Sequence, residues 1–122
     1  MTASTRSPST QTTRVILVRH GRSTFNDMGR YQGSSNQSVL TQKGKATARL
    51  VGQYLAQHCQ GSPIDVIYAS PLQRVQQTAA EICKQISQSP PIEVSQDLKE
   101  ISLSLWEGRT YADVRETFEV NP

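Results

Sequence analysis

The residues best suited to chemistry form one short run, Arg19-His20-Gly21, directly after the apolar stretch Val15–Val18. A neutral imidazole is a nucleophile near neutral pH, and a guanidinium offers a planar fork that matches the oxygens of a phosphate. Glycine lets the backbone turn sharply and approach a ligand closely. The run therefore predicts a histidine nucleophile in a phosphate site. On these residues alone, a histidine that only hydrogen-bonds backbone groups after a strand is the open alternative.

The elements that would position this run follow from the hydrophobic pattern. Four consecutive aliphatic residues at Val15–Val18 predict a strand buried on both faces, as in parallel sheets. Ligands bind at the carboxyl ends of such strands. Further strands are predicted at 64–69 and 92–94, separated by helices that begin at the caps Thr41 and Ser70. This β-α-β-α-β order predicts an α/β fold with right-handed crossovers and a parallel sheet.

The predicted helices each have an apolar stripe. Helical spacing assigns the buried stripe of the first to Ala46, Leu50, Val51, Tyr54, Leu55 and Cys59. The same spacing assigns the stripe of the second to Leu72, Val75, Ala79, Ile82, Cys83 and Ile86. A last helix is predicted over 111–120. The segment 24–39 is predicted to be a loop, of a length that is usually functional.

Further segments accompany Arg19-His20-Gly21 and Asn26 in a consistent order. They are Gly29–Gly33 with Leu40-Thr41 and Gly44, then Ser70–Ala79, and then Leu98–Glu100 with Trp106–Gly108. Together these segments resemble the histidine phosphatase (phosphoglycerate mutase-like) superfamily, from residue 14 to about the C-terminus. The resemblance implies a three-layer α/β/α fold with a mainly parallel sheet.

The resemblance also implies the residues of the site. His20 would be the nucleophile that forms a phosphohistidine, and Glu100 the general acid that protonates the departing oxygen and then activates water. Arg19 and Arg74 would clamp the phosphoryl group, with Arg74 near a helix N-terminus that favours anions. Their alternatives are an ion pair for Arg19 and an exposed helix position for Arg74. Other contacts to phosphate or substrate would come from Gly21, Ser23, Asn26, Gln32 and Gly33.

The proposed acid has competitors nearby, namely Glu93, Asp97 and Glu107. The spacing from Glu100 to Trp106-Glu107-Gly108 resembles the phosphatase-like branch of the family and selects Glu100. Ser104 stands where the family often has glycine, which leaves the path of this loop open. Trp106 is open between lining a substrate pocket and packing the loop.

A second active-site histidine is also implied, in a Ser-His-Gly-like context near the end of a later strand. No such segment occurs before Pro122. The only other histidine, His58, is interpreted as a surface residue near the end of the first helix. We therefore expect residues 1–13 to be a disordered Ser/Thr-rich tail and 14–122 to be a partial, C-terminally truncated histidine phosphatase domain.

Composition argues against several other classes. The 122 residues carry a net charge of +3 with scattered Lys and Arg, which disfavours a nucleic-acid partner. No apolar run is long enough to cross a membrane. Cys59, Cys83 and the histidines lack metal-ligand spacing, so we expect no metal, no cofactor and free thiols in a cytoplasmic protein. The sequence sets no oligomeric state.

The predicted function is a phosphomonoester hydrolase that acts on a small phosphorylated substrate through phosphohistidine. Losing a charge-stabilising donor costs about 10²–10³ in rate, so truncation is expected to impair it. The alternatives are a non-catalytic phosphate-binding fragment or pseudoenzyme and, within the family, a phosphoglycerate mutase. A helix directly after Trp106-Glu107-Gly108 favours the phosphatase. Sugar phosphates, phosphoglycerate, cofactor-precursor phosphates and phosphoprotein all stay open as substrates.

Overall fold

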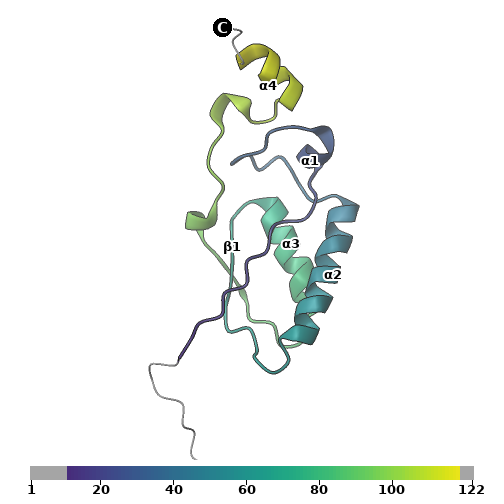
Figure 1. The fold of residues 1–122 in the computed structure, drawn as a ribbon, viewed down its shortest axis with the longest axis vertical. Coiled ribbons are helices and arrows are strands. Elements are labelled where there is room, and N and C mark those ends of the chain that lie inside the picture. Colours follow the sequence, from purple (N-terminus) through teal and green to yellow (C-terminus); the bar gives the residue numbers. More distant parts are fainter. Residues whose placement is uncertain (1–10, 119–122) are drawn as a thin grey trace, which may run out of the picture.

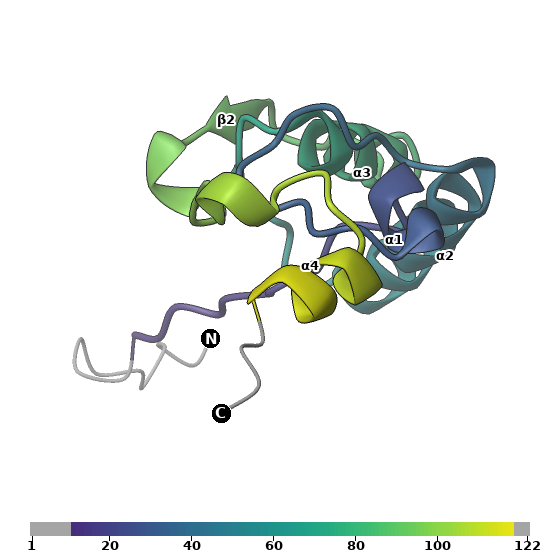
Figure 2. The ribbon, with the colours of Figure 1, turned by 90° about the horizontal axis from the view of Figure 1, so that it is seen from above.

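The computed structural model describes residues 11–118. In chain order its elements are α1 (Thr24–Met28), α2 (Gln42–His58), β1 (Ile67–Ala69), α3 (Gln73–Cys83), β2 (Ile92–Val94), the 3₁₀ turns η2 (Gln96–Leu98) and η3 (Ser104–Trp106), and α4 (Tyr111–Phe118). Helices α2 and α3 lie side by side, and α4 lies at the end of the molecule where α1 is found (Figure 1). Seen from above, α2 and α3 again adjoin (Figure 2). Residues 1–10 of the predicted tail and 119–120 of the last predicted helix lie outside the described residues.

Strands β1 and β2 form a parallel pair joined through α3. Their register places Ile67 opposite Ile92, and Ala69 opposite Val94. Helix α3 lies against β1. The predicted α/β class with a parallel sheet is therefore confirmed. The strand predicted at 92–94 forms as expected, whereas only the last half of the predicted strand 64–69 enters the ladder.

The strand predicted at Val15–Val18 is wrong for the described chain. Residues 11–22 form no strand, and the side chains of Val15 and Leu17 are 72% and 91% exposed. A strand needs a neighbour that completes its ladder and covers its faces. Within residues 11–118, β1 pairs with β2 alone. The apolar run instead forms an extended segment that leads up to α1 (Figure 1).

Helix α2 begins at its predicted cap, where the Thr41 hydroxyl accepts a hydrogen bond from the Gly44 N–H at 3.0 Å. The predicted buried stripe is confirmed at Leu55 and Cys59, with Val51 packed against the core, and is wrong at Ala46, Leu50 and Tyr54, which are exposed. The buried positions are instead the smaller residues Gly44, Ala48 and Gly52, with Leu55. A Cβ atom at Gly52 would lie 2.7 Å from the Ile82 carbonyl oxygen of α3. The small residues therefore let the two helices approach closely, at the expense of the larger apolar side chains.

The apolar core lies between α2 and α3. It consists of Ala48, Leu55, Cys59 and Ile82, with Val51, Ile64 and Ile86 packed against it. Helix α3 starts at Gln73 rather than at a Ser70 cap, and the Ser70 hydroxyl accepts from the Leu72 N–H instead. No helix within residues 11–118 has the length and apolar character to cross a bilayer.

Segment 24–39, predicted to be a loop, contains the short helix α1. Ser23 and Asn26 cap it reciprocally: the Ser23 hydroxyl accepts from the Asn26 N–H, and the Asn26 side chain accepts from the Ser23 N–H. Gly29 ends it with φ of 61°, a left-handed conformation that glycine adopts without strain. Two of the predicted site residues thus stabilise the first turn after His20.

Candidate active site

The backbone after His20 is fixed to both helices. The Gly21 N–H donates to the Thr78 hydroxyl at 3.0 Å, and that hydroxyl donates to the Arg74 carbonyl at 2.7 Å. On the other side, a Cβ atom at Gly21 would lie 2.6 Å from the Gly44 carbonyl oxygen. Only glycine fits so close to the first turn of α2. The position of His20 is therefore set by α2 and α3, although residues 11–19 before it form no strand.

The hydrogen bonds of His20 define its tautomer. Nδ1 lies 2.7 Å from the Gly21 carbonyl oxygen. A carbonyl can only accept, so Nδ1 carries the proton. Nε2 lies 3.3 Å from the amide nitrogen of Gln32, which can donate to its lone pair. The neutral ring therefore has its lone pair on Nε2, the nitrogen that would attack an electrophile.

Ser23 supports this arrangement from a fully buried position. Its hydroxyl accepts from the Asn26 N–H and donates to the Gln32 amide oxygen at 2.8 Å. That bond turns the Gln32 amino group towards His20. Ser23 thus positions Gln32 and has no surface open to a ligand.

The surroundings of His20 favour the neutral ring. Burial is the largest influence and lowers the pKa of His20 below its usual 6.5. The guanidiniums of Arg74 and Arg19 lower this pKa further. The Gly21 carbonyl and the Glu100 carboxylate oppose them without reversing the direction. At neutral pH the imidazole is therefore unprotonated and able to act as a nucleophile.

Arg74 is fully buried in the first turns of α3. Its Nη1 donates to the Ser35 carbonyl at 2.7 Å, and its Nη2 donates to the Gly33 carbonyl at 2.5 Å and to Glu100 Oε2 at 3.0 Å. The exposed position considered as an alternative is thus wrong. Nε is buried without an acceptor among the described residues. Arg74 joins the loop 33–35 to the proposed acid and retains one unsatisfied donor.

Glu100 and Glu107, two of the candidates for the general acid, have different environments. The Glu100 side chain is 46% exposed and pairs with Nη2 of Arg74 at 3.0 Å. Glu107 accepts from the N–H and hydroxyl of Ser34 and from the Leu103 N–H, at 2.9, 2.8 and 3.0 Å. Burial raises the pKa of Glu107, but these hydrogen bonds and Arg74 outweigh it and leave the pKa lowered. Glu107 is therefore an ionised structural anchor, while Glu100 stays accessible.

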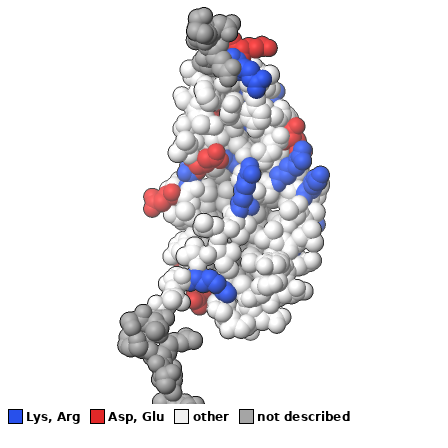
Figure 3. Space-filling model, in the orientation of Figure 1, with Lys and Arg blue, Asp and Glu red and all other residues white. Residues whose placement is uncertain are grey.

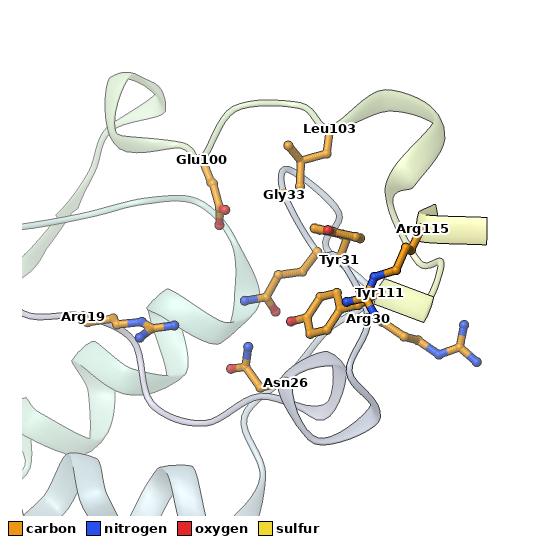
Figure 4. A pocket seen from close by; sticks show the side chains of 10 residues that line it. Arg19, Asn26, Arg30, Tyr31, Gly33, Glu100, Leu103, Tyr111 and Arg115 are labelled. Atoms are coloured by element: carbon orange, nitrogen blue, oxygen red, sulfur yellow. The ribbon is translucent and has the colours of Figure 1, made fainter. Parts of the chain in front are cut away.

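Several of the predicted site residues line one hollow of about 460 Å³ (Figure 4): Arg19, Asn26, Gln32, Gly33 and Glu100. His20 and Arg74 are not in this lining but contact residues that are. His20 lies within hydrogen-bond distance of Gln32, and Arg74 donates to Gly33 and Glu100. Its volume falls within the roughly 300–1,000 Å³ of small-molecule sites. The hollow therefore has room for a ligand larger than a phosphoryl group.

Sequence reasoning missed the rest of the lining, which is Arg30, Tyr31, Leu103, Tyr111 and Arg115. Arg30 and Tyr31 belong to the segment Gly29–Gly33 that carried the resemblance. Tyr111 and Arg115 are four residues apart and so share a helix face, a signal present in the sequence. Trp106 is absent from this lining and packs on Tyr31, with ring centroids 5.2 Å apart.

The remaining polar residues give no second site. His58 ends α2, where its Nδ1 lies 2.8 Å from the Tyr54 carbonyl oxygen and its ring stacks on Tyr54. Cys59 and Cys83 are free thiols. No group of His, Cys, Asp and Glu within residues 11–118 is placed to hold a metal ion. On the face in Figure 3, acidic and basic side chains are interspersed rather than gathered into one stripe.

Comparison with known proteins identifies the family. Residues 15–122 match the histidine phosphatase superfamily (branch 1), so the chain belongs to this family. It is 41% identical over 107 residues to the probable 2-carboxy-D-arabinitol-1-phosphatase of Arabidopsis thaliana, covering 88% of this chain and 21% of that protein. It is 36% identical over 107 residues to phosphoserine phosphatase 1 of Hydrogenobacter thermophilus, covering 86% of this chain and 46% of that protein. Phosphoglycerate mutases of two Bartonella species also match.

The fold agrees with the family. The phosphoserine phosphatase of Entamoeba histolytica, solved with 3-phosphoglyceric acid, superposes with a TM-score of 0.63 and 30% identity, covering 79% of this chain and 44% of that chain. The architecture is thus the phosphoglycerate mutase-like α/β fold. The chain spans less than half the length of each relative measured.

Proposed function

We propose that this chain hydrolyses small phosphomonoesters through a phosphohistidine at His20. The observation that carries the proposal is the neutral imidazole with its lone pair on Nε2, next to a hollow lined by arginines. A nucleophile must be unprotonated before it attacks phosphorus, and a phosphoryl group needs cationic donors around its oxygens. Family membership supports the same reaction class. Relatives named for phosphoserine and a carboxyarabinitol phosphate favour a small phosphorylated substrate.

In the first half-reaction, Nε2 of His20 attacks the phosphorus. The bond from phosphorus to the ester oxygen breaks with its electron pair on that oxygen, which receives the proton of the Glu100 carboxyl. Nδ1 keeps its proton and donates it in a hydrogen bond to the Gly21 carbonyl oxygen. This acceptor stabilises the positive charge that the ring gains when Nε2 is phosphorylated. In the second half-reaction, water attacks the phosphorus and gives its proton to Glu100. The phosphorus–nitrogen bond breaks and returns its electron pair to Nε2.

Arg74 and Arg19 supply positive charge to both steps. Because Glu100 occupies Nη2 of Arg74, an incoming phosphate competes with this carboxylate for the same guanidinium. Displacement frees Glu100, which takes up the acidic proton of a monoanionic phosphate ester and then faces the leaving oxygen. Asn26, whose amide oxygen already accepts from the Ser23 N–H, contributes its amino group.

A non-catalytic phosphate-binding role is the second candidate. It is favoured by the contacts of Arg74, whose Nη atoms both bind protein acceptors. A mutase would pass the phosphoryl group to another hydroxyl instead of water. These candidates make different predictions about what happens to phosphate on His20.

The test compares the wild-type chain with His20→Ala and uses His58→Ala as a matched control outside the hollow. Phosphate release from phosphoserine and p-nitrophenyl phosphate should fall by at least about 10³-fold in His20→Ala and stay unchanged in His58→Ala. Intact-mass spectrometry under alkaline conditions should find acid-labile phosphate on His20. Equal release by wild type and His20→Ala would overturn the hydrolase. Vanadate binding without turnover or phosphohistidine would establish the non-catalytic role.

A further inference from the structure

Arg30 and Arg115 lie at the end of the hollow opposite Arg19, with Tyr111 beside them (Figure 4). Arg30 follows α1 and precedes the loop of Gln32, whereas Tyr111 and Arg115 belong to α4. Two segments far apart in the sequence are joined there by hydrogen bonds from the Tyr111 N–H to the Gly29 carbonyl and from the Tyr31 N–H to the Arg109 carbonyl, each 2.9 Å long. This end of the hollow is therefore held together by backbone hydrogen bonds, and its residues are not those assigned to phosphoryl transfer.

The charges at this end are unbalanced. Glu100 is the only carboxylate in the lining, against the arginines 19, 30 and 115. On α4, the carboxylate of Asp113 pairs with Arg109 at 2.6 Å, and the charge of Arg30 acts on it as well. Glu107 is occupied by Ser34 and Leu103. Among residues 11–118, no ion pair joins Arg30 or Arg115 to a carboxylate. The residues that line this end of the hollow therefore include two guanidiniums and no carboxylate.

Arg30 is held in place before any ligand arrives. Its Nη1 donates to the Gly108 carbonyl at 2.5 Å, and its backbone N–H donates to the Phe25 carbonyl at 2.9 Å. A guanidinium has several further N–H donors in a fixed plane, so this contact orients the group without exhausting it. A preorganised guanidinium loses less side-chain entropy when it binds an anion.

The wall between the two charged ends is aromatic. Tyr31 packs edge-on against Tyr111 with ring centroids 4.7 Å apart, and its other neighbour is Trp106. Such a wall suits the carbon skeleton of a ligand better than a second polar contact. The hollow thus has cationic groups near His20, an aromatic middle and a second cationic end.

We propose that Arg30 and Arg115 bind a second anionic group of the substrate, a carboxylate on the same molecule as the phosphoester. This inference rests on the proposed function, because it assumes that the phosphoryl group lies at His20. It assigns the substrate to the phosphorylated carboxylic acids, and it makes Arg30 and Arg115 specificity-determining residues. The planar fork of a guanidinium matches a carboxylate in two-point contact.

The test uses two ligands that differ at this group: 3-phosphoglycerate has a carboxylate where glycerol 3-phosphate has a hydroxymethyl group. Affinities are measured by calorimetry on the 122-residue chain at about 0.15 M salt, where long-range attraction is screened. Wild type should prefer 3-phosphoglycerate by about tenfold, as expected for a charged hydrogen bond. Arg115→Gln should remove most of this preference and leave glycerol 3-phosphate binding unchanged.

The matched control is Lys43→Gln, which removes the same charge from an exposed position on α2 outside the hollow. It should keep the preference. Arg30→Gln should also lose it, and its unfolding curve separates loss of binding from loss of the Gly108 contact. If both ligands bind wild type equally, or if Lys43→Gln and Arg115→Gln behave alike, the second anion site is overturned alone. If neither ligand nor inorganic phosphate binds, the proposed function is overturned with it.

Discussion

The α2–α3 interface and the loops around Arg74 are stabilised by opposite kinds of contact. Between the helices, the buried side chains are Ala48, Leu55, Cys59 and Ile82. Around the site, the most completely buried side chains are polar: Arg74, Ser23 and Ser38. Dispersion and apolar burial tolerate swaps of similar volume, whereas a buried polar group left without its partner is costly. The α2–α3 interface should therefore tolerate substitutions of similar volume, whereas the geometry of the site depends on the hydrogen bonds of its loops.

The largest expected effect is that of Arg74→Met. It leaves the carbonyls of Gly33 and Ser35 without their donor, and each unsatisfied buried group costs about 1–3 kcal/mol. The free energy of unfolding in urea should fall by about 3 kcal/mol, and vanadate binding should be lost. Arg22→Met, which breaks an ion pair with Asp27 whose side chains are 52% and 44% exposed, should cost less than about 1 kcal/mol. Equal costs would show that the burial of Arg74 does not set the cost of losing its contacts.

Leu55→Ala should be next in size. Removing a large apolar side chain from the α2–α3 core should lower the free energy of unfolding by about 2 kcal/mol. Leu50→Ala, at a position 65% exposed, should change it by less than about 0.5 kcal/mol. The vanadate affinity of the folded Leu55→Ala chain should equal that of wild type, measured well below its unfolding transition. A loss of affinity would mean that the helix pair also shapes the site.

Gly21→Ala probes the place where the two regions meet. The added methyl group would lie 2.6 Å from the Gly44 carbonyl oxygen, so backbone must move. Overpacking of this kind should cost about 1–2 kcal/mol in urea unfolding. Gly61→Ala adds the same atom where nothing lies within 4 Å, and should leave stability within about 0.5 kcal/mol of wild type. A tolerated Gly21→Ala would show that the loop can shift away from α2.

The smallest expected effects concern the charge on His20. Arg19→Gln should raise the pKa of His20, and Glu100→Gln should lower it, because the guanidinium disfavours and the carboxylate favours the imidazolium. Nuclear magnetic resonance titration of the imidazole measures both. Since the folded state lowers this pKa from 6.5, the unfolded chain binds more protons just below that pH. Stability should therefore fall as the pH drops through this range. Shifts of the same sign in both variants would contradict the proposed geometry.

The sequence predicted the parts of the fold that depend on local signals. The Thr41 cap, the strand at 92–94 and the parallel pairing follow from residue type and element order. It mispredicted part of the buried face of α2, because spacing gives weight to Leu50 and Tyr54 whereas the packed helices needed Gly44 and Gly52. It also mispredicted Val15–Val18, since burial of a strand depends on neighbours that a local pattern does not contain.

For the candidate site, motif order indicated the residues near His20 but not how they connect. That Ser23 acts through Gln32, or that Arg74 holds the carbonyls of loop 33–35, depends on hydrogen bonds between segments up to 41 residues apart. The sequence did not indicate Arg30 and Arg115, because they line one hollow only through the packing of α4 against the loop after α1. Those roles remain predictions until the variants above are measured.

The approach of Gly21 to Gly44 has a consequence for how this protein can change over evolutionary time. In most interiors, a larger residue on one side can be accommodated by a smaller one opposite. Here each partner already has the smallest possible side chain, so no compensating exchange exists. The separation between the loop that carries His20 and the start of α2 is consequently set by main-chain atoms. Diversification of specificity must proceed elsewhere, through the side chains that surround this fixed point.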